Sequence, residues 1–157
     1  MNTGQRGFTY LGLLILIAVI GVSAAATLQV GAVLQRRAAE DELLAIGEEF
    51  RNALISYATA TPAGQKRYPN SLEDLLRDPR YPGVRRHLRH IYPDPLTGKE
   101  EWGMVRAADG SGIVGFYSLC EGRPIKIGNF APPFHEFEGK ALYRDWLFAI
   151  EAVHAKR

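Results

Sequence analysis

The sequence predicts an α+β protein in which a long N-terminal helix packs against a small antiparallel β-sheet. Three observations lead to this fold class. Residues 7–35 contain no charged side chain, no proline precedes Pro62, and beyond Pro62 turn-forming Pro and Gly residues alternate with β-favouring runs. One helix can therefore occupy the first third of the chain, with short strands in the remainder.

The charge distribution separates this first third from the rest. The 157 residues carry 19 Lys and Arg against 17 Asp and Glu, and Arg6 is the only one of these before Arg36. Residues 36–157 hold 18 bases and 17 acids, and a net charge of +1 indicates neither nucleic acid nor acidic lipid as a partner. Cys120 is the single cysteine, so no disulfide within the chain can stabilise the fold.

Residues 8–35 predict a helix that crosses a membrane. About 20 residues at 1.5 Å each already cross the ~30 Å hydrocarbon core, and this run is longer. A secretory signal peptide has a shorter apolar stretch that ends at a small-residue cleavage site. Here the apolar pattern continues past Ser23–Ala26 through Val30 and Leu34, so removal at that point is not expected.

Residues 36–60 predict that the helix continues in water with one apolar stripe against a domain. Apolar residues recur there at three- and four-residue spacing, and charged residues are assigned to the solvent side. The stripe consists of Leu43, Gly47, Phe50, Leu54 and Tyr57, flanked by Leu44, Ile46 and Ala53. The charged set consists of Glu40, Asp41, Glu42, Glu48, Glu49 and Arg51.

The residues Arg6-Gly7-Phe8-Thr9-Tyr10-Leu11-Gly12-Leu13-Leu14 form a basic leader end, then Gly, then Phe opening an apolar helix. This pattern resembles the class III signal of type IV pilins and type II secretion pseudopilins. The resemblance implies cleavage after Gly7 by a prepilin peptidase and N-methylation of Phe8. It also implies a single-pass protein of the bacterial inner membrane, with a cytoplasmic amino terminus and a periplasmic head.

That resemblance divides the chain into four parts. Residues 1–7 are a prepilin leader, residues 8–35 the transmembrane half of a spine helix, and residues 36–60 its periplasmic half. Residues 61–157 are a globular α+β head of the pilin-like kind.

Gly12 departs from the family pattern, which usually has Glu five residues into the mature chain. In the family that Glu is thought to meet the charged terminus of a neighbouring subunit. Some minor pseudopilins at the fibre tip resemble this chain in lacking the acid, so a tip-type subunit is one interpretation. A small residue also lets membrane helices approach closely, so packing alone is an equal interpretation.

The start of the head predicts a short second helix at 72–76, with Ser71 as its N-cap and two acids in the first turn. Residues 77–90 then hold five arginines against one aspartate. We interpret them as a solvated helix face with Leu88 and Ile91 turned inward. The alternative is a surface for an acidic partner subunit, a lipid headgroup or DNA. The segment lacks the interleaved aromatic residues that proteins use to bind single strands, so we prefer the first interpretation.

Four short strands are considered for the rest of the head. Residues 92–98 predict consecutive turns, followed by strands at 102–106 and 113–119. Residues 124–130 predict a third strand, and 143–150 fit either a fourth strand or a terminal helix. The Asp-Pro-x-x-Gly turn at Asp94 is similar to one in the major pseudopilin.

No metal site is expected. His87 and His90 could share a helix face, but no third ligand accompanies them, which argues against zinc. The acidic calcium loop that major pseudopilins carry near the carboxyl end is not evident. Asp94 and Asp109 are therefore interpreted as surface turn residues, because calcium needs six to eight oxygen ligands.

The sequence does not predict an enzyme or a cofactor. Cys120 has no nearby His, and no hydrolase, metalloprotease or phosphate-binding motif is present. The resemblance implies a structural pseudopilin-like subunit of a type II secretion system. Its partners would be the prepilin peptidase, other pseudopilin or pilin subunits, the inner-membrane assembly platform and membrane lipid, with nucleic acid not expected. The alternatives are a minor type IV pilin for adhesion, motility or DNA uptake, and a membrane-anchored periplasmic binding domain that does not assemble.

Overall fold

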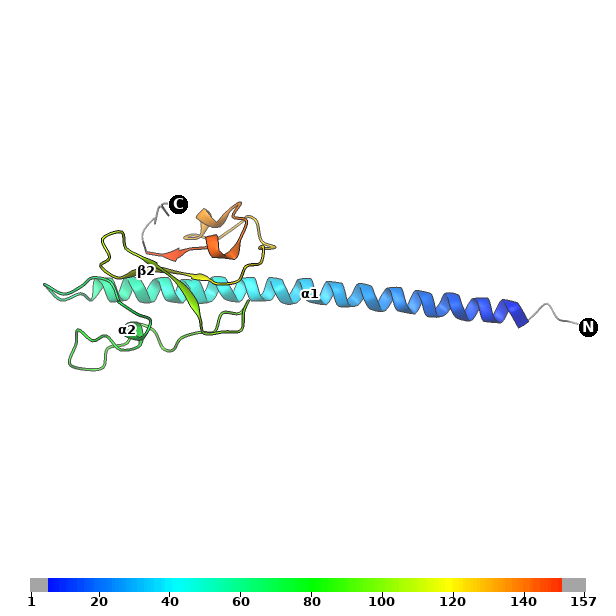
Figure 1. The fold of residues 1–157 in the computed structure, drawn as a ribbon, viewed down its shortest axis with the longest axis horizontal. Helices are drawn as coiled ribbons and strands as arrows, with labels where there is room; N and C mark the ends of the chain where they lie inside the picture. The colour runs from blue at the N-terminus through cyan, green and yellow to red at the C-terminus, as the bar shows by residue number, and fades with distance from the viewer. Residues whose placement is uncertain (1–5, 151–157) are drawn as a thin grey trace, which may run out of the picture. The chain divides into compact units, whose positions relative to one another are not determined.

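The computed structural model describes residues 6–150, and for residues 6–9 and 24–30 it describes the backbone only (Figure 1). The elements follow in the order α1 (Arg6–Thr59), α2 (Glu73–Leu76), β1 (Trp102–Arg106), β2 (Ile113–Ser118), the 3-10 turns η1 (His135–Phe137) and η2 (Tyr143–Asp145), and β3 (Phe148–Ala149). The α+β class is confirmed. Leader residues 1–5 and residues 151–157 of the predicted head lie outside the described part.

The chain divides into two compact units, Met1–Arg37 and Ala38–Arg157, which are described separately. In the first unit, α1 contains no proline and no charge beyond Arg6 until Arg36. The helix runs without interruption to Thr59, which agrees with the predicted continuation of one helix through residues 8–35 and 36–60. Over the residues that the structure describes, no helix meets the combined requirement of length and apolar character for a membrane span.

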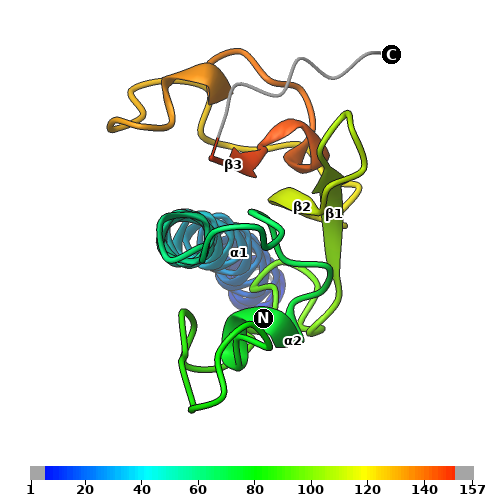
Figure 2. The same cartoon turned by 90° about the vertical axis from the view of Figure 1, so that its left-hand side faces the viewer.

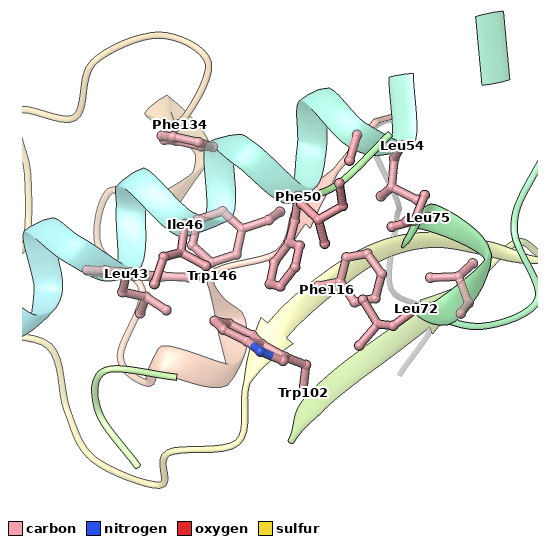
Figure 3. Close-up of a cluster of buried hydrophobic side chains, with 14 of the residues drawn as sticks. Leu43, Ile46, Phe50, Leu54, Leu72, Leu75, Trp102, Phe116, Phe134 and Trp146 are labelled. Atoms are coloured by element: carbon pink, nitrogen blue, oxygen red, sulfur yellow. The ribbon is translucent and has the colours of Figure 1, made fainter. Parts of the chain in front are cut away.

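In the second unit, the predicted apolar stripe of α1 forms one side of the core (Figure 3). Phe50 is fully buried and sits against the sheet, with its ring centroid 4.9 Å from that of Trp102 and 5.1 Å from that of Phe116. Gly47 lets β3 approach, because a Cβ atom there would lie 2.1 Å from the Phe148 ring. The prediction of this apolar stripe is therefore confirmed. Gly47 belongs to the buried face because its lack of a side chain leaves room for the Phe148 ring.

The prediction that Glu40 belongs to the charged, solvent-facing side of α1 is wrong. Glu40 is 1% exposed and lies on the core side of α1, three residues before Leu43. Arg51 is half-buried, and its Nε donates to the Ala149 carbonyl at 3.2 Å. Asp41, Glu42, Glu48 and Glu49 are exposed, as predicted.

The sheet has three antiparallel strands in the order β1-β2-β3. The strand predicted at 102–106 is confirmed, and the one predicted at 113–119 ends at Ser118. Residues 143–150 form neither one strand nor one helix, since η2 precedes the two-residue strand β3. In Figures 1 and 2, β3 and α2 lie on opposite sides of α1.

The strand predicted at 124–130 is wrong. The segment has no ladder partner, and the amides of Ile125 and Lys126 donate instead to the Glu40 carboxylate. The same segment then supplies Phe130, which packs edge-on against Trp146 with ring centroids 5.3 Å apart. The Glu40 carboxylate therefore supplies the hydrogen-bond acceptors that a neighbouring strand would otherwise provide.

The helix predicted over 72–76 is confirmed as α2, but its N-cap is Leu72 rather than Ser71. The Asp74 carboxylate accepts from the Asn70 amide at 2.8 Å. Residues 77–90 are not helical, because Pro79, Pro82 and Gly83 oppose a helix. The interpretation of this segment as a solvated helix face is therefore wrong, and His87 and His90 do not share a helix face. The predicted inward position of Leu88 and Ile91 agrees with the structure, in which Leu88 is buried and Ile91 half-buried.

Candidate functional site

From Tyr10 to Val22, the side chains of α1 are apolar and exposed on every side of the helix. Leu13 to Ile17 are five consecutive apolar residues, and each exposes between 46% and 57% of its surface. Five consecutive residues cover the full turn of a helix, so no polar face remains there. A helix that is apolar on all sides is typical of one whose surface is covered, by protein or by lipid.

Of the residues singled out in the sequence, two lie in the first turn of α1. Gly7 and Phe8 are helical in backbone, and their side chains are outside the described set. Cleavage and N-methylation at this position stay predictions. Gly12 is exposed, and a Cβ atom built there meets nothing within 4 Å.

Arg80 is the centre of a polar network at the end of α1. Its side chain is 5% exposed, and that of Asp78 is fully buried. Arg80 Nε donates to Asp78 Oδ1 at 2.8 Å and Nη2 donates to Oδ2 at 2.7 Å. The remaining guanidinium hydrogens reach Thr61 Oγ1 at 2.8 Å, the Lys66 carbonyl at 2.9 Å and the Tyr57 carbonyl at 2.8 Å. All five N–H groups of the guanidinium therefore have an acceptor.

This network satisfies the C-terminal end of α1. The carbonyls of the last helical turn have no partner inside the helix, and a cation near them is favourable. Arg80 supplies that cation and also lies 3.5 Å above the centroid of the Tyr57 ring. The Tyr81 hydroxyl donates to the carbonyl of Ala60, the residue that follows α1. Residues 77–90 therefore close the helix end instead of forming a solvated helix.

His87 joins the same network. Its side chain is 1% exposed, and Nε2 lies 3.2 Å from Asp78 Oδ2 while Nδ1 lies 2.8 Å from Ser56 Oγ. Because an ionised carboxylate only accepts, Nε2 carries the proton and Nδ1 accepts from Ser56. Both ring nitrogens are occupied, so His87 is a structural residue. His90 instead contacts Tyr92, with ring centroids 4.1 Å apart and the ring planes tilted by 47°.

The pKa values of this network follow from its contacts. Burial raises the pKa of the Asp78 carboxyl, but the hydrogen bonds from Arg80 and His87 outweigh it and hold that pKa at about 2, against an ordinary 3.8. Burial lowers the pKa of the His87 imidazole, and the hydrogen bond to Asp78 opposes that shift only in part. Asp78 is therefore ionised and His87 neutral at physiological pH.

A second buried carboxylate, that of Glu40, fixes the chain after β2. Glu40 Oε1 accepts from the Ile125 amide at 2.5 Å and from the Tyr143 hydroxyl at 2.6 Å, while Oε2 accepts from the Lys126 amide at 3.0 Å. Glu40 lies three residues before Leu43 and seven before Gly47, which is the spacing of the buried stripe. That spacing was the signal in the sequence that could have identified it.

Asp94 is also buried, which corrects its prediction as a surface residue. Its Oδ2 accepts from the Ser118 hydroxyl at 2.6 Å and its Oδ1 from the Leu96 amide at 2.9 Å. The residue fastens the turn at 94–98, where Gly98 has a positive φ of 71°, to the end of β2. Asp109 is an exposed turn residue, as predicted.

No group of three or more His, Cys, Asp or Glu side chains placed to hold a metal ion occurs among the described residues. Cys120 is a half-buried free thiol, and its sulfur accepts weakly from the Gly122 amide at 3.4 Å. The buried polar groups named above bond to one another and to backbone. In the described part of the chain they link separate segments of the head to one another and to the end of α1.

The geometry defines an α+β protein with an apolar N-terminal helix and a head that polar links fasten to the end of that helix. Comparison of the chain with protein-family models, with curated proteins and with solved structures found no match.

Proposed function

We propose that the chain is a structural, pseudopilin-like subunit of a type II secretion system. It is inserted in the inner membrane through residues 8–35, with its amino terminus in the cytoplasm and its head in the periplasm. It is drawn from there into a short periplasmic fibre together with other pseudopilin subunits, by the inner-membrane assembly platform.

The observation that carries this proposal is the exposed apolar surface of α1 between Tyr10 and Val22. Ten large apolar residues in this stretch are 46% to 72% exposed. Burying one such side chain stabilises by about 1.5–3 kcal/mol, so removing all ten from water would strongly favour association with lipid or with other helices. Lipid before assembly and neighbouring helices after assembly would both cover this surface, which suits a subunit that moves from membrane to fibre.

The head supports the same proposal in a second way. The Ala38–Thr59 part of α1 contributes its stripe to the core, and Arg80 and Tyr81 bond to its last carbonyls. The head is thus fastened along and at the end of the Ala38–Thr59 part of α1. A fibre subunit needs such a link, since its helix is pulled while its head packs on neighbours.

The test is the mature terminus of the protein. The full chain is co-expressed with a prepilin peptidase and a methyltransferase activity, and its mass is determined. We expect loss of residues 1–7 and a methylated Phe8. A Gly7→Leu variant should remain uncleaved, whereas the matched Gly12→Leu variant should be processed. A mature terminus near Ala26 would contradict the proposal and make the head a secreted domain.

Assembly is tested separately from processing. Cysteine pairs introduced along residues 10–22 of two copies should cross-link in cells that contain the cognate machinery. Processing without any cross-link would favour a membrane-anchored domain that does not assemble.

A further inference from the structure

We propose that the four exposed arginines of the segment after α2 bind the acidic face of α1 in a second copy of this chain. The basic loop is defined as Arg77, Arg85, Arg86 and Arg89, and the acidic stripe as Asp41, Glu42, Glu48 and Glu49. The inference rests on the proposed function, since it names the neighbour that one part of the head contacts.

The basic loop is a rigid surface with unbalanced charge. The one acid among residues 77–90, Asp78, is buried and is fully used by Arg80 and His87. Backbone bonds from the His87 and Leu88 amides to the Leu75 carbonyl, at 2.8 and 2.9 Å, hold the loop against α2. The four remaining arginines are exposed, and none forms an ion pair within the described residues.

The acidic stripe is the complementary surface. Asp41 and Glu48 are seven residues apart on α1, as are Glu42 and Glu49, so the four acids share one face. All four are exposed, and none forms an ion pair within the described residues. Arg51, two residues after Glu49, is directed to the Ala149 carbonyl instead.

The two surfaces do not neutralise each other within one copy, because they lie at different heights of the head. The segment 77–90 that carries the basic loop meets the end of α1 through Arg80, which donates to the Tyr57 carbonyl, and through His87, which bonds to Ser56. Glu49 and Asp41 precede Tyr57 by about 12 Å and 24 Å along the helix, at 1.5 Å per residue. Those separations exceed the ~8 Å screening length of physiological salt.

Two complementary surfaces at different heights of one molecule make a head-to-tail contact, with the loop of one copy against the stripe of the next. A contact of this kind is heterologous and can repeat along an axis. Opposite charges at the rim of such a contact select the partner and its register more than they add affinity. The apolar part of α1 supplies the affinity, and the charge pairs determine the axial stagger.

The experiment is a charge-reversal exchange in the full-length chain, purified in detergent. Arg86→Glu/Arg89→Glu makes the loop acidic, and Glu48→Arg/Glu49→Arg makes the stripe basic. Association of two preparations, labelled with donor and acceptor at their carboxyl ends, is measured by energy transfer. Each variant alone should associate at least about tenfold more weakly than the wild type, because like charges then face each other.

Mixing the two variants should restore association, since each acidic loop then meets a basic stripe and each acidic stripe a basic loop. Raising the salt should weaken the wild type and the mixture alike. Arg86→Lys/Arg89→Lys should behave as the wild type. Arg123→Glu/Lys140→Glu is the matched control; it reverses two exposed charges in the segment that lies across α1 from the basic loop (Figure 2), and should have no effect.

Tryptophan fluorescence melts of each variant establish that the head is folded. If either reversed variant associates as well as the wild type, or if the folded variants do not complement each other, the proposal is overturned. The measurement is independent of peptidase processing. Failure here with a correctly processed Phe8 terminus would therefore remove the charge contact and leave the proposed function standing.

Discussion

The Tyr143 hydroxyl donates to Glu40 Oε1 at 2.6 Å, across 103 residues of sequence. With the Ile125 and Lys126 amides on the same carboxylate, this bond ties three separate parts of the chain together. The Glu40 carboxylate therefore determines the path of the segment that has no regular structure between β2 and η1.

Glu40→Gln should destabilise the head by about 2 kcal/mol, because the amide group donates where a carboxylate oxygen accepted, and a buried N–H loses its partner. The check is urea unfolding of the full chain in detergent, followed by tryptophan fluorescence. Trp102 and Trp146 are the only tryptophans and both lie in the core, so the signal reports the head. The exposed Glu48→Gln should change the free energy of unfolding by no more than about 0.5 kcal/mol. Equal stability of the two variants would mean that Glu40 is not needed for this path.

Arg80→Lys should lower the free energy of unfolding by about 2–3 kcal/mol. A lysine ammonium has three donors and no planar fork, so it cannot replace five hydrogen bonds and the contact with the Tyr57 ring. Arg86→Lys, which changes an exposed arginine in the same loop, is the matched control and should be neutral. Hydrogen exchange of the last turn of α1 should quicken only in the Arg80 variant; unchanged protection there would remove the argument that Arg80 closes the helix.

Asp78 makes the head sensitive to acid. Its folded-state pKa of about 2 lies below the ordinary 3.8, so its stabilising effect is complete above pH 3.8 and is lost as the pH falls towards 2. The loss amounts to about 2 kcal/mol by linkage. The lowered pKa of His87 has the same sign, since the buried neutral ring opposes protonation on the acid side of 6.5. Urea unfolding at several pH values should show a steeper acid loss for the wild type than for Asp78→Asn, and parallel curves would contradict this origin.

Gly47→Ala should destabilise the head by about 2 kcal/mol even though Ala is the better helix former by about 1 kcal/mol. The new Cβ would lie 2.1 Å from the Phe148 ring, which must then leave its place in β3. Gly83→Ala is the control, because a Cβ there meets nothing within 4 Å. A Gly47→Ala variant as stable as the wild type would show that β3 can shift without cost.

Gly12→Glu tests the position of the subunit in a fibre. In a tip subunit the new carboxylate would lie in the bilayer without a partner, at about 2.5–3.5 kcal/mol on insertion scales, and fewer fibres should form. In a repeating subunit a neighbour's charged terminus would meet the carboxylate, and assembly should be unchanged or better. The departure at Gly12 points to the first outcome, whereas the repeating contact proposed above requires the second, and electron microscopy of cells with the cognate machinery distinguishes the two. More or longer fibres in the mutant would refute the tip position, and Gly12→Ala is the steric control.

The long helix and its buried stripe could be predicted from sequence because their causes are local. The absence of proline before Pro62 and the three- and four-residue spacing from Leu43 to Tyr57 suffice to predict α1 and the face it buries. The same holds for β1 and β2, where β-favouring runs flank a connection with Asp-Gly. Cleavage at Gly7 and methylation of Phe8 likewise depend on a short pattern, and they stay predictions.

Tertiary structure alone decided which charged residues are buried. Glu40 and Asp78 resemble their exposed neighbours in the sequence, and their burial depends on donors that come from Tyr143, 103 residues away, and from Arg80 and His87 in an irregular loop. The Glu40 carboxylate also explains why residues 124–130 form no strand, because it accepts from the Ile125 and Lys126 amides. A buried carboxylate is stable only where several hydrogen bonds converge on it, and no pattern along the chain records that convergence.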